Sequence, residues 1–328
     1  EAPEAKRRMK NLLEVTGLLE VLDSQSPHAL ATEAQLRLVH PKQYLDAFKS
    51  LSDGAGGNLG LRTPFGPGGF EIASLSCGLV ISALFSVLDG QHKNAYALSR
   101  PPGHHCLPDY PNGFCLLNNI AVAVQAARQA GKAERFAIVD WDVHHGNGTE
   151  HIFYADKDVL TISIHQERNY PLDSGDAGDT GADTAPLSNM NIPLMPGGGR
   201  IAYKDAFERL VLPKLQAFKP DMIIVACGFD ASGVDPLSRM LLGAADFAML
   251  TKMLMEQTGG KLVMAHEGGY SDAHSPFCGH AVLQEMSAAT ITAEDPLGAR
   301  ITGQQPGDRF NQLQRDILTD IARLHQLA

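Results

Sequence analysis

The chain has 328 residues, of which 44% are hydrophobic and 20% are charged, and its formal net charge at pH 7 is −10. This composition is typical of a globular protein. The acidic balance argues against sequence-independent binding to a nucleic-acid backbone, so we expect no direct nucleic-acid partner. It is compatible with cationic substrates, because a negative field attracts them.

The cysteines favour a reducing compartment. The chain has five of them, none forms a C-x-x-C pair, and the number is odd. This usage argues against a disulfide scaffold and against a thiolate zinc site. No signal peptide is visible, and no uninterrupted apolar run reaches the ~18 residues of a membrane span. We therefore expect a cytoplasmic protein with no membrane partner.

Sequence patterns predict helices and strands that alternate along the chain. An apolar stripe that includes Met9, Leu13 and Leu22 predicts a core-facing helix at the start, and Asp53–Gly69 is a loop rich in Gly and Pro. The later predicted elements are, in chain order, a helix over Ile72–Leu88, a strand over Asn94–Leu98, a helix over Asn118–Ala130, strands over Phe136–Asp140 and Val159–Ile164, a helix over Tyr203–Phe218, a strand over Met222–Cys227, a helix over Asp246–Thr258 and a strand over Lys261–His266.

This alternation predicts an α/β fold with a mostly parallel central sheet and helices on both faces. Nearly continuous apolar strands, such as the one at Met222–Cys227, fit a sheet that is covered on both sides. The length would allow two domains. Because the sequence shows neither a linker nor an internal repeat, we expect a single domain over residues 1–328.

Ionisable residues follow four of the predicted strands. In an open α/β sheet, ligands bind beyond the carboxyl ends of the strands. The four segments therefore converge on one edge of the sheet and predict an active site there. They are SRPPGHHC with His104 and His105, DWDVHHGNG with Asp140, Asp142, His144 and His145, CGFDASGVDP with Asp230, and HEGGYSD with His266, Glu267 and Tyr270.

The Asp142-x-His144 pair indicates a metal site. Alternate residues of an extended segment point to the same side. A carboxylate oxygen and an imidazole nitrogen can then reach one ion at ~2.0–2.2 Å, with Asp230 as the candidate third ligand. Three protein ligands leave a coordination position open, as in catalytic zinc sites. The simpler alternative is a polar turn whose side chains are solvated.

Acid–base residues accompany this pair. One of the adjacent histidines His104 and His105 can accept a proton from water while the other tunes the local charge, and Asp140 is a candidate hydrogen-bond partner that fixes a histidine tautomer. Tyr270, which follows two glycines, can donate a hydrogen bond to a developing oxyanion. The alternatives are histidines that cap a loop and a tyrosine that packs on the surface.

At these residues the sequence resembles the zinc-dependent histone deacetylase and acetylpolyamine amidohydrolase family, in its class II and bacterial branch. The matching segments are RPPGHHC, NGFCLLNN, DWDVHHGNGTEHIF, TISIH, CGFDA and HEGGY, which span most of the chain from Arg100 to Tyr270. The resemblance implies an arginase–deacetylase fold with about eight strands in the sheet. The family's first strand does not precede the opening helix here, so we expect that the native start is missing.

The resemblance also implies roles for individual residues. Asp142, His144 and Asp230 match the ligands of one zinc ion per subunit, His105 the general base, His104 its tandem partner paired with Asp140, Asn147 the position paired with His105, and Tyr270 the tyrosine that polarises the substrate carbonyl. Gly113, Phe114, Tyr170 and Leu237 match the walls of a narrow acyl-lysine tunnel. Asp140, Asp142, His144, Ser163 and Ile164 match a structural potassium site, and Phe153, Asp156 and Val159 match a second, weaker one.

Two departures from the family pattern matter. Arg62, in LRTPFGPGGFEIA, stands where an aspartate often precedes Thr-Pro. An aspartate there would clamp a substrate backbone, so Arg62 counts against peptide clamping. His145 stands next to His144, where a second metal site would need another carboxylate, and this fits a single catalytic ion.

We therefore predict a zinc-dependent amidohydrolase that removes acetyl or other acyl groups from lysine side chains of proteins or peptides. Acetylated polyamines or other small amides are the alternative substrates, with Asp109 as one candidate contact. A catalytically silent acyl-lysine binder is the third hypothesis, which metal analysis would test because a binder need not hold stoichiometric zinc. We expect a homo-oligomer, either a dimer or a tetramer.

Overall fold

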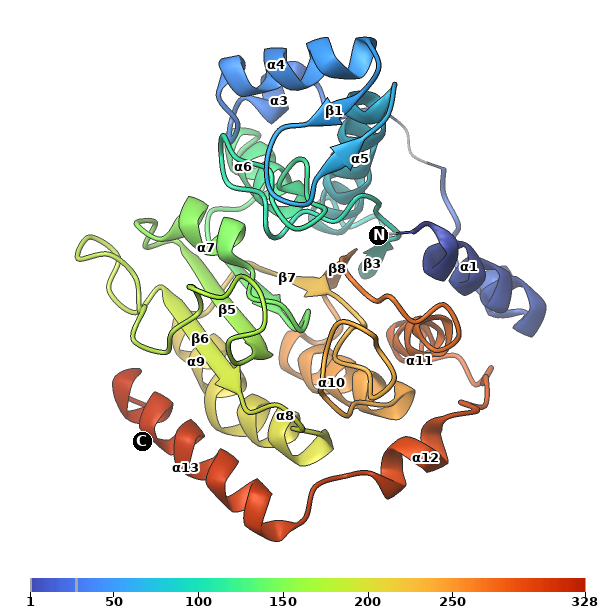
Figure 1. The fold of residues 1–328 in the computed structure, drawn as a ribbon, viewed down its shortest axis with the longest axis vertical. Coiled ribbons are helices and arrows are strands. Elements are labelled where there is room, and N and C mark those ends of the chain that lie inside the picture. Colours follow the sequence, from blue (N-terminus) through green and yellow to red (C-terminus); the bar gives the residue numbers. More distant parts are fainter. Residues whose placement is uncertain (1, 27–28, 328) are drawn as a thin grey trace.

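A six-stranded parallel sheet lies between two layers of helices (Figure 1). This computed structural model describes residues 2–26 and 29–327. The strand order is β3-β8-β7-β4-β5-β6, and every neighbouring pair is parallel. The strands are β3 (Asn94–Ala97), β4 (Phe136–Asp140), β5 (Val159–Gln166), β6 (Asn189–Leu194), β7 (Met222–Cys227) and β8 (Leu262–His266).

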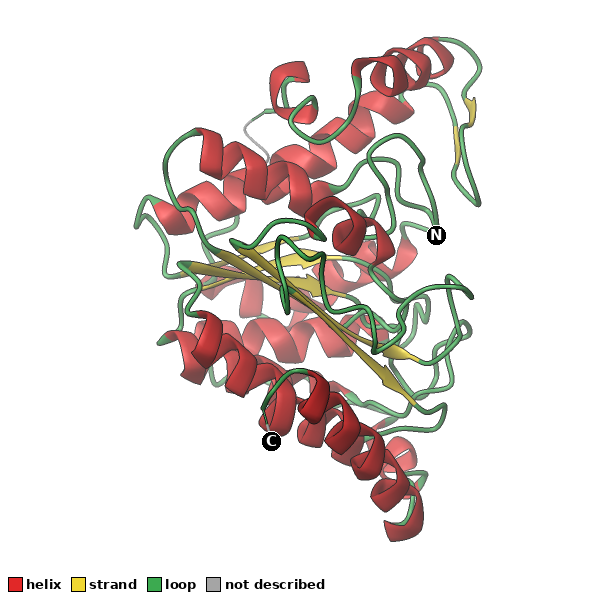
Figure 2. Cartoon of the chain, turned by 90° about the vertical axis from the view of Figure 1, so that its left-hand side faces the viewer, coloured by secondary structure: helices red, strands yellow, loops and turns green. Residues whose placement is uncertain are grey.

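Helices cover both faces of this sheet, as Figure 2 shows. In the first half of the chain they are α1 (Glu4–Thr16), α2 (Leu18–Val21), α3 (Glu33–Leu36), α4 (Lys42–Asp53), α5 (Gly69–Leu88), α6 (Asn119–Gln129) and α7 (Asn147–Phe153). In the second half they are α8 (Arg200–Ala206), the π-helical turn η1 (Phe207–Val211), α9 (Leu212–Phe218), α10 (Ala244–Thr258), α11 (Ser275–Ser287), α12 (Gly298–Gly303) and α13 (Asp308–Leu324).

Each face of the sheet supports its own hydrophobic cluster. In β4, Ala137 and Val139 pack with residues of α1, α8, α10 and α11, whereas Phe136 and Ile138 pack with residues of α4, α5 and α6. Alternation of this kind follows from the period of two along a strand. Because β4, β5, β7 and β8 are buried at every position, the predicted α/β class with a doubly covered parallel sheet is confirmed.

The strand count implied by the resemblance is too high. The described part of the chain has six strands in the central sheet, and two further short strands, β1 (Gly57–Asn58) and β2 (Pro64–Phe65), form a separate antiparallel hairpin. This hairpin lies within the predicted loop Asp53–Gly69. Sequence patterns also missed β6, because its asparagines and Pro193 disfavour strands. Pro193 is tolerated because β6 is an edge strand.

Two predicted helices are interrupted. The opening helix breaks at Gly17, whose left-handed φ of 81° ends α1 before α2 begins. The helix predicted over Tyr203–Phe218 is present, but it begins at Arg200 and contains the π-helical turn η1. Pro213 near the start of α9 explains this π-helical turn. Proline cannot donate the helical hydrogen bond, and its ring displaces the carbonyl of the residue four positions earlier.

Helix α5 packs against α6 and β3. It is 20 residues long and apolar enough to pass a length-and-composition test for a membrane span, although the sequence shows no uninterrupted apolar run of that length. Half of its apolar window is buried against the rest of the protein. The core helix of a globular protein passes the same test, so the length and composition of α5 are weak support for a membrane span.

Candidate active site

The ionisable segments that follow the strands meet at one edge of the sheet. β4 lies between β5 and β7, with Asp140 in register with Ser163 on one side and with Ala226 on the other. β7 pairs in turn with β8, which places Cys227 opposite His266. The residues after each strand therefore project into the same volume, as the sequence predicts.

Asp142, His144 and Asp230 form one buried cluster. Their ligand-type atoms all lie within 4.8 Å of one another. The Nδ1 atom of His144 is 3.1 Å from Asp142 Oδ1 and 3.1 Å from Asp230 Oδ2. Backbone N–H groups hold the other two carboxylate oxygens: Gly268 donates to Asp142 at 2.8 Å and Val143 donates to Asp230 at 2.7 Å. The donor atoms are thus fixed before any ion binds.

This donor set fits a zinc ion. Burial and the charge of Asp142 raise the pKa of Asp230 to about 8, because two carboxylates share one buried site. Two carboxylates and one imidazole suit Zn²⁺ and leave a coordination position open. Glycines make the arrangement possible, because a Cβ atom at Gly228 would lie 2.3 Å from Asp142 Oδ2, and one at Gly268 would lie 2.3 Å from Asp230 Oδ2.

His105 is held as a neutral base. Its Nδ1 lies 2.8 Å from the amide oxygen of Asn147. Because that oxygen only accepts hydrogen bonds, Nδ1 carries the proton and Nε2 is left as an acceptor. Burial, together with the charges of His104 and His144, holds the pKa of His105 well below its usual range.

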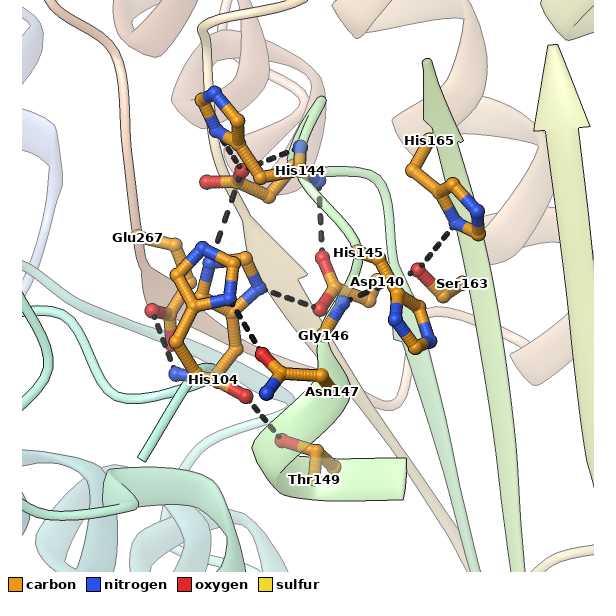
Figure 3. A network of polar contacts seen from close by, with 12 residues as sticks. His104, Asp140, His144, His145, Gly146, Asn147, Thr149, Ser163, His165 and Glu267 are labelled. Carbon is orange, nitrogen blue, oxygen red and sulfur yellow. Dashed lines mark hydrogen bonds and ion pairs between the residues drawn. The ribbon is translucent and has the colours of Figure 1, made fainter. Parts of the chain in front are cut away.

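His104, in contrast, is protonated and positively charged, although its ring centroid is only 3.9 Å from that of the neutral His105. Its Nδ1 lies 2.8 Å from Asp140 Oδ2 (Figure 3). Burial alone would lower the pKa of His104, but the charges of Asp140 and Asp142 outweigh it and raise the pKa to about 10. A carboxylate partner and an amide partner thus give two adjacent histidines different chemistry.

Tyr270 presents a protonated hydroxyl group near the cluster. Its ring centroid is 6.2 Å from that of His144 and 5.9 Å from that of Phe114. Burial and the charges of Asp230 and Asp142 raise its pKa well above the usual range, so the hydroxyl remains a hydrogen-bond donor. The backbone N–H of Tyr270 donates to Asp235 Oδ2 at 2.7 Å, which fixes the start of this segment.

The predicted tunnel residues lie next to these groups. The Tyr170 ring is 5.0 Å from that of His105 and 6.1 Å from that of His144. Gly113 has a left-handed φ of 49°, and a Cβ there would lie 2.4 Å from His105 Cδ2 and 2.8 Å from Tyr170 Cε1. Leu237 is 43% exposed, and its carbonyl accepts a hydrogen bond from the residue before Tyr170. Leu237 therefore lies on the outer rim of the site.

The residues predicted to bind potassium are also brought together, although ion binding stays a prediction. Ser163 Oγ lies 3.4 Å from the Gly146 backbone N–H, on the strand beside Asp140 (Figure 3); Ile164 follows it in β5. In the second set, the carbonyl of Phe153 accepts the N–H of Asp156, whose own carbonyl accepts the N–H of Val159. The Asp156 carboxylate pairs with Arg128, so an ion here would share the backbone carbonyls that accept these N–H groups.

Sequence reasoning assigned no role to several supporting residues. Glu267 Oε2 accepts the backbone N–H groups of Gly103 and His104, at 2.7 and 3.2 Å, and so positions the tandem histidines. Lys6 of α1 donates to the Glu267 carbonyl at 3.1 Å. Glu267 and Asp235 stand in the quoted segments HEGGYSD and CGFDASGVDP, so their position was a usable signal; nothing in the sequence links Lys6 to this edge.

A second group of ligand-type atoms, from His104, Cys115 and Glu267, is also buried here. Burial raises the pKa of the Cys115 thiol well above its usual range, so the sulfur keeps its proton. Glu267 Oε2 accepts two backbone N–H groups, whereas Oε1 is buried without a hydrogen-bond partner among the described residues, and His104 Nδ1 is paired with Asp140. These three residues therefore support the tandem histidines and do not resemble a metal site.

Comparisons with known proteins agree on one family. Residues 1–286 match the histone deacetylase domain. The chain is 51% identical over 326 residues to a histone deacetylase-like amidohydrolase of Pseudomonas aeruginosa, which covers 98% of this chain and 86% of that protein. It is 36% identical over 260 residues to a probable deacetylase of Archaeoglobus fulgidus, covering 78% and 72% of the two chains.

A solved structure agrees with the fold. The crystal structure of the HDA15 HD domain superimposes with a TM-score of 0.88 at 33% sequence identity, and the alignment covers 99% of this chain and 90% of that one. The family domain extends over most of the sequence, and the relatives match the parts that carry the strand-exit segments. The chain therefore belongs to the histone deacetylase family.

Proposed function

We propose that this protein is a zinc-dependent deacetylase that hydrolyses the side-chain amide of acyl-lysine in a protein or peptide. Family membership supports hydrolytic deacetylation. One observation carries the rest: the buried donor set of Asp142, His144 and Asp230 lies beside a neutral His105 with an available Nε2. A structural metal site would need no such base.

The residues divide the hydrolysis between them. When bound, zinc supplies Lewis-acid chemistry that lowers the pKa of water and polarises a carbonyl group. His105 Nε2 accepts the proton of the attacking water as the water oxygen bonds to the amide carbon. The Tyr270 hydroxyl donates a hydrogen bond to the developing oxyanion. The C–N bond then breaks, and the proton on His105 passes to the leaving amine, which gives a carboxylate and a free amine.

The walls of the site favour a slender substrate. Gly113 lies against both His105 and Tyr170, where no larger side chain would fit. The narrow tunnel that the family resemblance implies would admit an unbranched acyl-amine and exclude bulky amides. Acyl-lysine is such a group, and so is an acetylated polyamine, which remains the alternative substrate. Because the acceptor on His105 and the donor on Tyr270 are both in place, a catalytically silent binder is disfavoured.

We further propose that potassium binds beside Asp140 and Ser163 and, more weakly, at Phe153, Asp156 and Val159. The strand pairing of Asp140 with Ser163 and the backbone carbonyls gathered at the second set support this proposal. Both positions flank α7 and the segment that carries the metal donors. Thermal unfolding in potassium chloride should occur at a higher temperature than in choline chloride at equal ionic strength, and equal unfolding temperatures would contradict it.

The deciding experiment compares kcat/KM for an acetyl-lysine peptide and for a monoacetylated diamine, after chelation and again with zinc restored. We expect turnover of the peptide only with zinc, at one ion per chain. Undiminished turnover without metal would contradict zinc dependence, and no turnover of either substrate would contradict the deacetylase. A higher kcat/KM for the diamine would select the alternative substrate class.

A further inference from the structure

Arg62 lies on the rim of the candidate active site because its backbone is bonded to the tunnel wall. The carbonyl of Leu61 accepts the N–H of Gly113 at 3.0 Å, and the carbonyl of Arg62 accepts the N–H of Phe114 at 3.1 Å. A third bond runs from the Leu61 N–H to the carbonyl of Pro111. The tip of the β1–β2 hairpin is thus added to the edge of the wall, and Arg62 cannot move away without breaking these bonds.

The Arg62 side chain covers an aromatic ring of the same wall. Its guanidinium carbon is 5.4 Å from the centroid of the Tyr170 ring, a cation–π contact. This contact is close to the catalytic histidines, because the Tyr170 ring is 5.0 Å from that of His105. A substrate that places its amide at His105 therefore carries its neighbouring groups past this guanidinium.

The charge of Arg62 is available to a ligand. Arg62 is exposed, and in the described part of the chain no acidic side chain forms an ion pair with it. Asp235 beside Tyr270 is buried and already accepts the backbone N–H groups of Tyr270 and Leu237. In a protein of net charge −10, this rim thus presents an unneutralised cation to the substrate.

We propose that Arg62 is a specificity-determining residue, which favours acyl-lysine flanked by an acidic residue and disfavours cationic substrates such as acetylated polyamines. This inference rests on the proposed function. A carboxylate next to the acyl-lysine can pair with the planar guanidinium, which is held in place by the Tyr170 ring. The free ammonium group of an acetylated polyamine would meet the same charge and be repelled.

The test uses the zinc-loaded full chain and three peptides that differ only in the residue beside acetyl-lysine, which is glutamate, glutamine or lysine. We expect kcat/KM to fall in that order, by about twofold to fivefold a step, the range of an exposed ion pair. The preference should weaken in 0.5 M salt, because salt screens exposed charges. Arg62→Gln should remove the preference, Arg62→Glu should reverse it and Arg62→Lys should retain part of it.

Arg309→Gln is the matched control, since it removes an exposed arginine from α13, at the far end of the molecule from the hairpin (Figure 1). It should leave the order of the peptides unchanged. Equal kcat/KM values for all three peptides in the wild-type enzyme would overturn the inference and leave the deacetylase intact. An equal loss on all three in Arg62→Gln would also overturn it, because that pattern indicates a structural role for the side chain. No turnover of any acetyl-lysine peptide would instead contradict the proposed function.

Discussion

The floor and the rim of the active site are built differently. We use floor for His104, His105, Asp142, His144 and Asp230, and rim for Arg62, Phe114, Tyr170 and Leu237. The floor residues are almost fully buried, with Asp230 at 0% and His144 at 6% exposure, whereas Leu237 on the rim is 43% exposed. Residues of both groups lie in loops between elements, and the floor residues lie in the loops that follow β3, β4 and β7.

This difference separates chemistry from selectivity. On the floor, backbone N–H groups hold the outer oxygens of Asp142 and Asp230, so one substitution disturbs several fixed partners. On the rim, Arg62 is held by its backbone, while its side chain contacts one aromatic ring. We therefore expect floor substitutions to abolish the reaction, and rim substitutions to change which substrate is accepted.

The largest effect is expected from Asp230→Asn. The variant keeps an oxygen for the Val143 N–H but loses an anionic ligand, so zinc content should fall below one per chain. The value of kcat/KM should fall by at least ~10³-fold, since a metal Lewis acid contributes several kcal/mol. The metal-free variant should be as stable as the metal-free wild type or more so, because a buried carboxylate with a raised pKa destabilises the fold at pH 7.

Metal analysis, peptide turnover and thermal unfolding would together check this prediction. Stoichiometric zinc with full turnover would contradict the role of Asp230. A marked loss of stability in the metal-free variant would show that Asp230 is needed for folding. The claim that this floor residue serves the reaction and not the stability of the fold would then be wrong.

Tyr270→Phe should act on the reaction without releasing the metal. The ring that contacts Phe114 and His144 remains, and only the hydroxyl is lost. Loss of one oxyanion donor lowers kcat by ~10²–10³-fold. Single-turnover rates with parallel zinc analysis would measure it. Unchanged kcat with one zinc per chain would remove Tyr270 from the mechanism.

Gly113→Ala tests the boundary between floor and rim. The new methyl group would lie 2.4 Å from His105 Cδ2 and 2.8 Å from Tyr170 Cε1, so one ring must shift. A displacement of about 1 Å can reduce the rate by ~10²-fold. We therefore expect kcat/KM for the acetyl-lysine peptide to fall by ~10–100-fold, with zinc retained.

Gly131→Ala is the matched control for this change. Gly131 also has a left-handed φ, of 66°, but no atom lies within 4 Å of its added Cβ. The backbone strain of ~1–2 kcal/mol is therefore similar, and kcat/KM should not change. If both variants lost activity equally, strain rather than crowding at the tunnel would be the cause.

The floor could be predicted from the sequence because its geometry follows from simple rules. Asp142 and His144 follow a buried strand, Asp230 follows its neighbour, and parallel strands end at the same edge. The continuous apolar runs of β4 and β7 likewise predict a buried parallel sheet. Strand β6 was missed because its asparagines and proline are unfavourable in strands, and its burial depends on pairing with β5.

The contacts around the floor could not be predicted, because they join distant parts of the chain through loops. Lys6 reaches Glu267 across 261 positions, and the Tyr170 hydroxyl donates to the side chain of Asn112, 58 positions earlier. No local pattern encodes such a contact. The position of Arg62 could not be predicted either. The family resemblance showed that an arginine is unusual there, but only the folded hairpin shows that its side chain lies over the Tyr170 ring.

The prediction farthest from the chemistry concerns the support of the rim by His40. Its Nδ1 donates to the carbonyl of Pro108 at 2.8 Å, and its Nε2 accepts the N–H of Asn118 at 3.0 Å. These two residues bracket the segment that carries Gly113 and Phe114. Both bonds need neutral imidazole, since protonated Nε2 would face another donor. Burial lowers the pKa of His40 to about 4.

The sign of the pH effect follows from the unfolded chain, in which histidine titrates near 6.5. Above pH 6.5 the contribution of neutral His40 is complete, and it is lost as the pH falls towards 4, by about 3 kcal/mol in total. Urea unfolding at pH 7, 5.5 and 4.5 should therefore show a smaller decline in His40→Gln than in the wild type, although the variant is less stable at pH 7. His151→Gln, at an exposed position of α7, should decline like the wild type. Equal declines in the wild type and His40→Gln would show that the rim is not held by a neutral histidine. A smaller decline, with faster hydrogen exchange over residues 107–118 in the wild type at low pH, would show that acid loosens the rim through His40.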